Sequence, residues 1–386
     1  MSLRLAYVCQ YFTREYGGPV TNLMHELSKS VDVVNYSYVG KHMQYYKGGR
    51  HEKTVERVDD RLTLKRYEAW LRLSGLIVPS GLGGMLAEDR PDVVQSEEYY
   101  QPASRIAFRY AKKNRVPFIF NHRLSEARTR TLRDRAFFAF ANPYCRDLVK
   151  GADAVVCLSE AGKKVLCDVY PEAADKVRII PNSIDPSRYS GGEGIGFRQE
   201  NNIPEDAPLL LAVARLHPQK RIDLLVKAFA EVKHRNRDAV LCVVGPWFVE
   251  EKRKVDSLVR ELRVEDVLFT GPIPNQRVKD AYAACDVVGF TSEYEPFGYS
   301  LLEAMACAKP VVAFGIGAVS EIVEDSITGH IVPFADVKGF AEKAGGLCCD
   351  RQLAKRMGDA GFARVCDKFN LRLNSERLVR IYGEVA

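Results

Sequence analysis

The chain of 386 residues lacks several patterns, and each absence excludes a class of protein or site. It has no Asp-x-Asp pair and no cluster of His or Cys at metal-ligand spacing, so no metal site is predicted. Its ten cysteines include no Cys-x-x-Cys pair and are scattered, mostly in apolar segments, which indicates reduced thiols rather than disulfides. No run of eighteen apolar residues occurs, so no transmembrane helix is expected.

Two further absences concern the first residues and the glycines. A strand-like segment, Leu3–Cys9, begins almost at once, so no signal peptide is expected and a cytoplasmic location is predicted. The full Gly-x-Gly-x-x-Gly spacing is missing, which argues against an oxidoreductase that binds a dinucleotide. The composition, with 46% hydrophobic and 27% charged residues, is that of a globular protein long enough for two domains.

Strand-like runs alternate with helix-like runs along the chain. Many of the strand-like runs are almost continuously apolar, which is typical of strands buried on both faces of a parallel sheet. Helical segments such as Lys220–Arg235 and Val249–Leu262 fit βαβ crossovers, so an α/β fold is predicted. The predicted strands are Leu3–Cys9, Val31–Ser37, Val93–Gln95, Phe118–Asn121, Ala154–Leu158, Val177–Ile180, Leu209–Ala214, Ala239–Val244, Val267–Thr270, Val287–Thr291, Val311–Phe314 and Gly329–Val332.

A glycine-rich break divides the chain into halves of similar rhythm. The run Tyr189-Ser-Gly-Gly-Glu-Gly-Ile-Gly196 has four glycines in eight residues, which is typical of a linker. We predict one Rossmann-like domain over residues 1–188, a linker over 189–203, a second such domain over 204–369 and a tail helix within 370–386. Two doubly wound domains facing each other across a cleft would bind ligands at the carboxyl ends of both parallel sheets.

The stretch from Glu295 to Glu303 is the most informative part of the chain. An apolar run, Val287–Phe290, predicts a buried strand, and a Pro-Phe-Gly break then precedes a helix predicted from Tyr299 to Ala308. One acid is therefore expected in the loop before this helix and the other in its first turn.

The predicted N-terminus of this helix is suited to an anion. Two carboxylates beside such a phosphate cradle suit a ligand with phosphate and several hydroxyls, such as a nucleotide sugar. The helix dipole alone also favours an acid there, so Glu303 has a purely structural alternative. The backbone N–H groups predicted to lack intrahelical partners are those of Gly298, Tyr299, Ser300 and Leu301.

Basic residues follow the predicted strand Leu209–Ala214. Arg215 and Lys220 lie between this strand and the next helix, where a forked guanidinium and a point charge suit a diphosphate. A polar loop is the alternative. Because no metal motif exists, neutralising a diphosphate would fall to these side chains and the helix N-terminus rather than to a divalent metal.

Two features of the first half indicate a ligand site with less specificity. Gly17 and Gly18 follow the first strand, and paired glycines let a backbone approach phosphate or sugar closely, although Gly-Gly before Pro is equally a turn. His122 follows the strand Phe118–Asn121 at its carboxyl end, which favours function, although a lone histidine is often structural.

A basic stretch runs from Arg123 to Arg135 and is followed by the aromatic run Phe137-Phe-Ala-Phe140. Residues 101–150 carry 12 basic and 3 acidic side chains. We interpret the stretch as a solvated helix face with aromatics in the core. The alternative is a peripheral contact with an anionic membrane.

Taken together, these motifs resemble those of the retaining glycosyltransferases with the GT-B fold known as family four, or glycosyl transferases group 1. The stretch from Glu295 to Glu303, together with the Lys309-Pro-Val-Val that follows it, is highly specific for that family, whereas the other motifs are individually weak but occur in the family's order. The other motifs are Gly17-Gly18, Pro181-Asn-Ser-Ile-Asp185, Ala214-Arg-Leu-His-Pro-Gln-Lys220 and Phe269-Thr-Gly271.

The resemblance implies a role for each matching residue. Glu303 would hold the donor ribose, Glu295 the transferred sugar, and Arg215 and Lys220 the diphosphate, with His122 near the transferred sugar. Backbone N–H groups from Phe297 to Leu301, namely those of Phe297, Gly298, Tyr299, Ser300 and Leu301, would face sugar and phosphate. Gly17 and Gly18 would close over the diphosphate, and the base would lie near Gly271 to Ile273.

The implied activity is transfer of a sugar from a UDP- or GDP-sugar, such as GDP-mannose, to an acceptor hydroxyl in glycan biosynthesis. Residues 1–188 would be the acceptor side, joined by the tail helix, and residues 204–369 would bind the donor. The implied partners are a nucleotide-sugar donor and a sugar, lipid-linked or other hydroxyl acceptor, with no cofactor, metal or nucleic acid. The location would be cytoplasmic or peripheral at the inner membrane face.

Departures from the family pattern leave the base and sugar preference open. Ser183 and Arg221 replace usual glycines, and Gly245-Pro-Trp247 differs from the usual Gly-x-Gly. Two rival functions share the architecture. One is a nucleotide-sugar epimerase, and the other is a non-catalytic sugar-nucleotide binding subunit, against which the intact charged residues argue.

Overall fold

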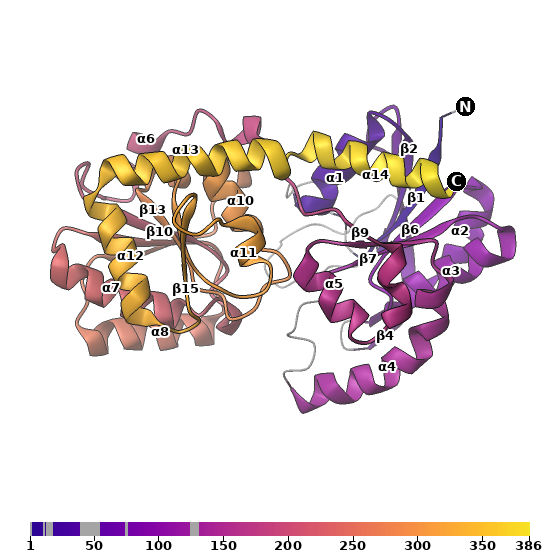
Figure 1. Cartoon of the computed structure of the whole chain (residues 1–386), viewed down its shortest axis with the longest axis horizontal. Helices are drawn as coiled ribbons and strands as arrows, with labels where there is room; N and C mark the ends of the chain where they lie inside the picture. The colour runs from indigo at the N-terminus through magenta and orange to yellow at the C-terminus, as the bar shows by residue number, and fades with distance from the viewer. Residues whose placement is uncertain (1, 11, 13–17, 39–54, 74–75, 124–130) are drawn as a thin grey trace. The chain divides into compact units, whose positions relative to one another are not determined.

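The computed structural model describes residues 2–10, 12, 18–38, 55–73, 76–123 and 131–386. The chain divides into two compact units, residues 1–182 with 371–386, and residues 183–370. Each unit contains a largely or wholly parallel sheet covered by helices (Figure 1). Among the described residues, no helix is long and apolar enough to cross a membrane.

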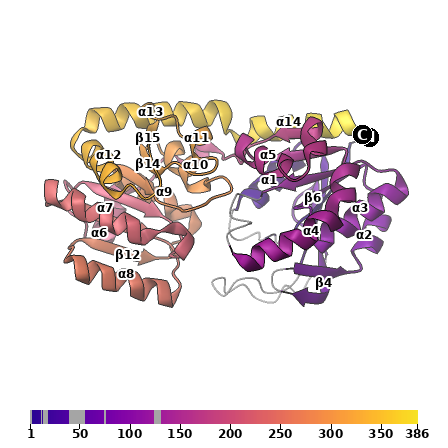
Figure 2. The same cartoon turned by 60° about the horizontal axis from the view of Figure 1, so that its bottom comes forward.

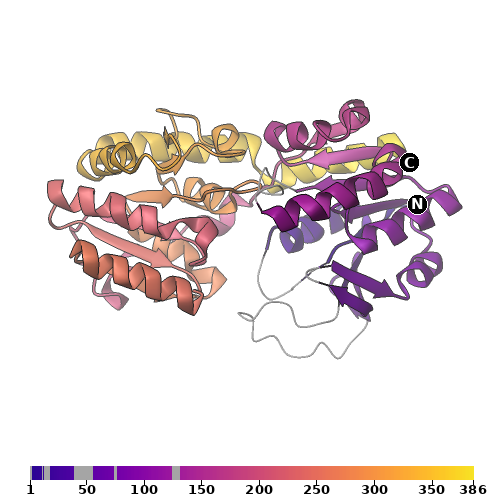
Figure 3. The same ribbon diagram turned by 90° about the horizontal axis from the view of Figure 1, so that it is seen from below.

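The described part of the first unit contains a nine-stranded sheet in the order β3-β4-β2-β1-β6-β7-β8-β9, with β5 paired to β4. Pairing of the described strands is parallel except where β3 and β5 meet β4. The strands of this unit are the purple arrows in Figure 3. The strands are β1 Arg4–Val8, β2 Asp32–Tyr38, β3 Val55–Arg57, β4 Leu62–Leu73, β5 Leu76–Ser80, β6 Val93–Glu97, β7 Phe118–His122, β8 Ala154–Cys157 and β9 Val177–Ile179.

Helices pack on both faces of this sheet. Because successive side chains of a strand point to opposite faces, Ala6 and Val8 join one apolar core while Leu5 and Tyr7 join another. The second core includes Leu378 of the C-terminal helix α14, which lies alongside α1 (Figure 1, yellow). The helices are α1 Pro19–Ser28, α2 Leu82–Asp89, α3 Pro102–Asn114, α4 Leu132–Gly151, α5 Glu160–Cys167, η3 Pro171–Lys176 and α14 Leu371–Val385 (Figure 2).

The second unit contains a six-stranded sheet in the order β12-β11-β10-β13-β14-β15, with every pairing parallel. The strands are β10 Leu209–Val213, β11 Val240–Val244, β12 Val267–Gly271, β13 Val287–Phe290, β14 Val311–Phe314 and β15 Gly329–Val332. The helices are η4 Pro186–Tyr189, α6 Gly194–Glu200, η5 Pro218–Lys220, α7 Ile222–Arg235, α8 Val249–Leu262, η6 Asn275–Arg277, α9 Val278–Ala284, α10 Tyr299–Ala306, α11 Val319–Ile322, α12 Val337–Cys349 and α13 Arg351–Lys368.

The predicted α/β fold with parallel sheets is confirmed, and the buried apolar runs correspond to the parallel strands. β3, β4 and β5 were not predicted. Their pairing is antiparallel, and β4 alternates fully buried Leu62 and Leu64 with half-buried Thr63 and Lys65, so it lacks a continuous apolar run.

The glycine-rich stretch of residues 189–203 lies within the second unit and includes α6. Gly194 packs so closely on α9 that a Cβ there would stand 2.8 Å from the backbone carbon of Ala283. The glycines of this stretch therefore allow close packing within the second unit.

Candidate functional site

The loop after β13 leads into α10 through a glycine in the left-handed region. Gly298 has φ 99° and caps α10, and a Cβ there would stand 2.9 Å from a side-chain carbon of Leu301. Two details of the sequence prediction are wrong. The Leu301 N–H donates to the Gly298 carbonyl oxygen at 3.1 Å, so it is not unpartnered. Glu303 lies beyond the first turn, because α10 begins at Tyr299.

The loops that follow β10 and β13 lie side by side because these strands pair in parallel. Gln219 joins them: its side chain donates to the Tyr294 carbonyl oxygen at 2.9 Å, and its own carbonyl oxygen accepts the Glu293 N–H at 2.8 Å. As a result, Lys220 forms an ion pair with Glu295, and their side chains are 16% and 17% exposed. The structure thus brings together two residues predicted from separate motifs.

Arg215 lies at the start of the same loop, two residues after β10 ends, and is half-buried. His217 caps the short helix η5, where its Nδ1 accepts the Gln219 N–H at 3.2 Å. Burial, followed by the charge of Arg215, lowers the pKa of His217 below its usual value. A neutral His217 is suited to this role, because only a neutral imidazole has a nitrogen that accepts a hydrogen bond.

Glu303 is 9% exposed and is held by two tyrosines. Its Oε1 accepts the Tyr189 hydroxyl at 3.0 Å, and its Oε2 accepts the Tyr282 hydroxyl at 3.0 Å. Burial raises the pKa of Glu303, while the two hydroxyl groups lower it in part. Sequence reasoning missed both tyrosines, because they come from η4 and α9 and no local motif marks them.

The remaining predicted residues of the second unit differ in their surroundings. Phe297 is 2% exposed and packs edge-to-face on Phe369 at 6.0 Å, so its side chain belongs to the core. Gly271 ends β12 with φ 76°, and a Cβ there would lie 3.4 Å from the Trp247 ring. Tyr299, Ser300 and Ile273 are half-buried, whereas Leu301 is fully buried.

The first unit has a buried polar cluster at the carboxyl ends of its central strands. Glu97 accepts hydrogen bonds from Tyr7, from Asn121 at 2.9 Å and from Arg123 at 3.0 Å. His122 ends β7, is 1% exposed and stacks on Tyr99 at 6.0 Å between ring centroids. Sequence reasoning identified His122 and missed the acids beside it.

The two predicted glycines are only partly described. Gly18 caps α1, and a Cβ there would meet nothing within 4 Å, so the space beside it is open. Gly17 lies outside the described residues.

The basic stretch from Arg123 to Arg135 is described only at its ends, because residues 124–130 lie outside the described residues. The aromatic run that follows is divided between the two sides of α4: Phe138 is 8% exposed and Phe140 is 73% exposed. The prediction that these aromatics lie in the core therefore holds for Phe138 and is wrong for Phe140.

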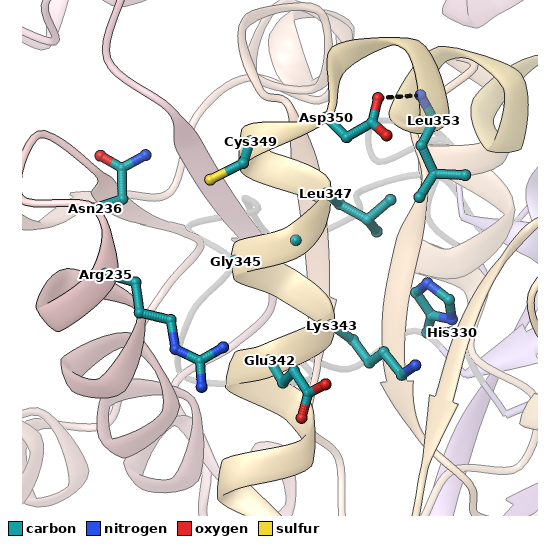
Figure 4. Close-up of a pocket in the computed structure, with 11 residues that line it drawn as sticks. Arg235, Asn236, His330, Glu342, Lys343, Gly345, Leu347, Cys349, Asp350 and Leu353 are labelled. Atoms are coloured by element: carbon teal, nitrogen blue, oxygen red, sulfur yellow. Dashed lines mark hydrogen bonds between the residues drawn. The ribbon is translucent and has the colours of Figure 1, made fainter.

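A pocket of about 570 Å³ lies elsewhere in the second unit (Figure 4). None of the predicted site residues lines it. Its lining comes from the C-terminal end of α7, the middle and C-terminal end of α12, the start of α13 and His330 of β15, and Lys343 points toward His330. In a βαβ unit these helix ends lie at the amino ends of the strands, opposite the edge where Lys220 and Glu295 meet.

The two parallel α/β units, each with charged side chains at the carboxyl ends of its strands, define a GT-B fold. Many solved structures share it. Anabaena HepE in complex with UDP has a TM-score of 0.80 and 18% identity, with 99% of this chain and 100% of that one covered. Sucrose-phosphate synthase from Thermosynechococcus elongatus has a TM-score of 0.79 and 20% identity, with 99% and 98% covered.

Family profiles match both halves of the chain. The profile of Glycosyltransferase Family 4 matches residues 20–188, and that of Glycosyl transferases group 1 matches residues 196–364. The chain therefore belongs to the family-four, group 1 glycosyltransferases.

Curated relatives agree with the family. The D-inositol 3-phosphate glycosyltransferase of Stackebrandtia nassauensis is 29% identical over 307 residues, which cover 76% of this chain and 68% of that protein. The protein of the same name from Saccharomonospora viridis is 31% identical over 245 residues, which cover 61% of this chain and 57% of that protein.

Proposed function

We propose that the protein transfers a sugar from a nucleotide-diphosphate sugar to an acceptor hydroxyl with retained anomeric configuration. The observation that supports this most is the meeting of Lys220 and Glu295 beside α10, which carries Glu303. In this proposal Lys220 binds the diphosphate, Glu295 the sugar hydroxyls and Glu303 the ribose hydroxyls. One polar edge of the sheet thus binds the three parts of a donor.

The proposed donor nucleotide is UDP, with GDP as the alternative. Support for UDP comes from the fold neighbour HepE, which has been solved with UDP, with UDP-glucose and with UDP and glucose. The base would lie beside Gly271 and Ile273. GDP-mannose remains the alternative donor because no described contact in the base region selects a pyrimidine over a purine.

The proposed chemistry needs no metal. The bond between the anomeric carbon and the β-phosphate oxygen breaks as the acceptor oxygen attacks the same face, and the acceptor proton passes to the departing phosphate. Arg215 and Lys220 would stabilise the negative charge that develops on this phosphate, with the positive end of the α10 helix dipole. The products are the glycosylated acceptor and a nucleoside diphosphate.

The acceptor is proposed to be a hydroxyl of a sugar, a lipid-linked sugar or another glycan precursor, bound by the first unit. We further propose that α4 rests on an anionic membrane at its cytoplasmic face. The exposed side of α4 presents Leu132, Phe140 and Tyr144, which are 83%, 73% and 51% exposed and are spaced by multiples of four residues. Exposed Arg133 and Arg135 lie in the first turn of the same helix, and basic residues beside exposed apolar ones suit anionic lipid.

A panel of nucleotide sugars tests the proposed transfer. We expect one UDP- or GDP-sugar at saturating concentration to raise the melting temperature and then to give a glycosylated product with an acceptor hydroxyl. NMR of the product's anomeric proton would establish retention or inversion. An epimerised nucleotide sugar formed without acceptor would favour the epimerase instead, and binding without turnover on any acceptor would favour a binding subunit.

A further inference from the structure

Glu98, in the first unit, has an unusual backbone conformation. It follows β6 directly and has φ 61°, in the left-handed region that residues with a Cβ avoid. Strained backbone of this kind is found most often at functional sites, and Glu98 lies at the carboxyl edge of the sheet.

The Glu98 carboxyl group is also poorly satisfied for a buried acid. The side chain is 9% exposed, and its Oε1 accepts the Arg123 N–H at 2.8 Å. Its Oε2 is buried and accepts no hydrogen bond from any residue that the structure describes. That oxygen lies 3.9 Å from Nδ1 of His122. Such contacts are commonly longer than a hydrogen bond before substrate binds and tighten in the complex.

The neighbouring acid Glu97 provides a contrast within the same turn. Glu97 forms an ion pair with Arg123 and accepts hydrogen bonds from Tyr7 and Asn121, so its buried carboxylate is satisfied by protein groups. Among the residues that the structure describes, no lysine or arginine side chain pairs with Oε2 of Glu98. Burial, then the charge of Glu97, raises the pKa of Glu98 to about 8, although Arg123 lowers it in part. At neutral pH Glu98 is therefore mostly a carboxylic acid that has a proton to donate.

Strand pairing and ring stacking hold His122 next to the Glu98 carboxyl group. β6 and β7 pair in parallel with Glu97 opposite Asn121, which puts Glu98 and His122 together at the carboxyl edge, where α/β sheets bind ligands. Tyr99 stacks on the imidazole with 27° between the ring planes. Among the described residues, the other titratable groups whose charges act on Glu98 or feel its charge include Glu97, Arg123, Tyr100 and Cys157.

We propose that Glu98 is a positioning residue that donates its carboxyl proton to Nδ1 of His122 and so fixes the neutral imidazole with its own proton on Nε2. His122 then presents an N–H donor, suited to an oxygen of the transferred sugar. The expected effect on the reaction rate rests on the proposed glycosyl transfer. The position of the proton on His122 does not depend on that function.

Two substitutions of Glu98 separate positioning from packing. In Glu98→Gln the amide oxygen still accepts the Arg123 N–H and the NH₂ group donates to Nδ1, which mimics the protonated acid at every pH. We expect kcat within about threefold of wild type at pH 7 and no loss of rate above about pH 8, where the wild type loses its donor. Glu98→Gly accepts φ 61° without strain but has no donor, so kcat should fall about tenfold or more, as when outer-shell partners of histidines are removed.

The matched control is Arg115→Gly, because Arg115 is an exposed residue with φ 55° that ends α3. It removes the same kind of backbone strain away from the site and should leave kcat unchanged. NMR of ¹⁵N-labelled histidine, with His122 assigned by His122→Gln, should show the proton on Nε2 in wild type and in Glu98→Gln, and a changed tautomer in Glu98→Gly.

The proposal is overturned if Glu98→Gln loses as much activity as Glu98→Gly, if its pH profile equals that of wild type, or if wild-type His122 has its proton on Nδ1. If no nucleotide sugar supports transfer at all, the proposed function fails, whereas the NMR result still decides the role of Glu98.

Discussion

Lys220 and Glu295 form an ion pair between the loops that follow β10 and β13, and each side chain is more than four-fifths buried. Lys220 also lies over the ring of Phe290, with Nζ 5.7 Å from the ring centroid. The residue proposed for the donor diphosphate is therefore already engaged by the residue proposed for the donor sugar. A diphosphate that binds Lys220 competes with Glu295 for the same ammonium group.

This competition predicts opposite effects of two substitutions. Glu295→Gln frees Lys220, so UDP should bind as tightly as to wild type or up to about tenfold tighter, while turnover falls at least about 100-fold. Lys220→Gln should weaken UDP binding. Calorimetry and initial rates measure both. Equal weakening by the two substitutions would contradict the competition, and the double substitution would give the coupling energy.

Glu303 should be the main determinant of nucleotide affinity. Glu303→Ala is expected to weaken UDP binding by about 2 kcal/mol, or about thirtyfold, because hydrogen bonds to a charged group are lost. Tyr282→Phe is the matched control: it keeps the Glu303 carboxylate and removes one of the two hydroxyl groups that orient it, together with that hydroxyl's contact with the Ser300 carbonyl oxygen, so a loss of about 1 kcal/mol is expected. Calorimetry that finds unchanged affinity for Glu303→Ala would exclude the ribose role.

Transfer should survive removal of divalent metal. Arg215 and Lys220 are proposed to supply the positive charge that a metal would otherwise bring to the diphosphate. Initial rates after dialysis against EDTA should equal those with added Mg²⁺ within about twofold. A strict requirement for Mg²⁺ or Mn²⁺ would overturn the metal-free account without affecting the fold assignment.

The protein should bind anionic vesicles through α4. Liposome flotation with phosphatidylglycerol vesicles at low salt should recover the wild type, and Phe140→Ser or Arg133→Glu should reduce recovery. Phe362→Ser is the matched control, because Phe362 is 41% exposed on α13 of the other unit. If the wild type does not float at low salt, or if Phe362→Ser reduces recovery as much as Phe140→Ser does, α4 is only a solvated helix face.

Stability should fall as pH rises through the range in which Glu98 ionises. The pKa of Glu98 in the folded chain, about 8, is above the usual value of 4.5, so the folded state binds more protons between these values. The contribution of this group to stability is therefore full below about pH 4.5 and is lost as pH rises through about 8. Glu98→Gln should flatten this part of a melting-temperature profile, and an unchanged slope would contradict the raised pKa.

The sequence alone was enough to predict the strands that pair only in parallel, but not β3, β4 and β5, which pair with one another in antiparallel fashion. Strands buried on both faces, such as β11, are continuous apolar runs that a single sequence reveals. β3 has an exposed or half-buried pattern, and the side chains of β4 alternate, so their pairing depends on neighbours distant in the chain.

The candidate site shows the same division. Glu295 and Glu303 belong to one short motif, and Lys220 to another, so sequence reasoning found all three. The partners Tyr189 and Tyr282 of Glu303 come from two other elements, and their hydroxyl groups meet the carboxylate only in the folded unit. In the sequence, Tyr282 has the pattern of a core residue of an amphipathic helix, and Tyr189 begins a glycine-rich stretch. No spacing rule marks either tyrosine as a hydrogen-bond donor.

The sequence by itself therefore determined the parallel strands, through their apolar runs, and showed which charged residues follow them. Only the tertiary structure decided which of these residues meet, since Lys220 reaches Glu295 through the pairing of β10 with β13. It also decided that Glu98 faces His122, because burial and strand register act between segments that the sequence separates.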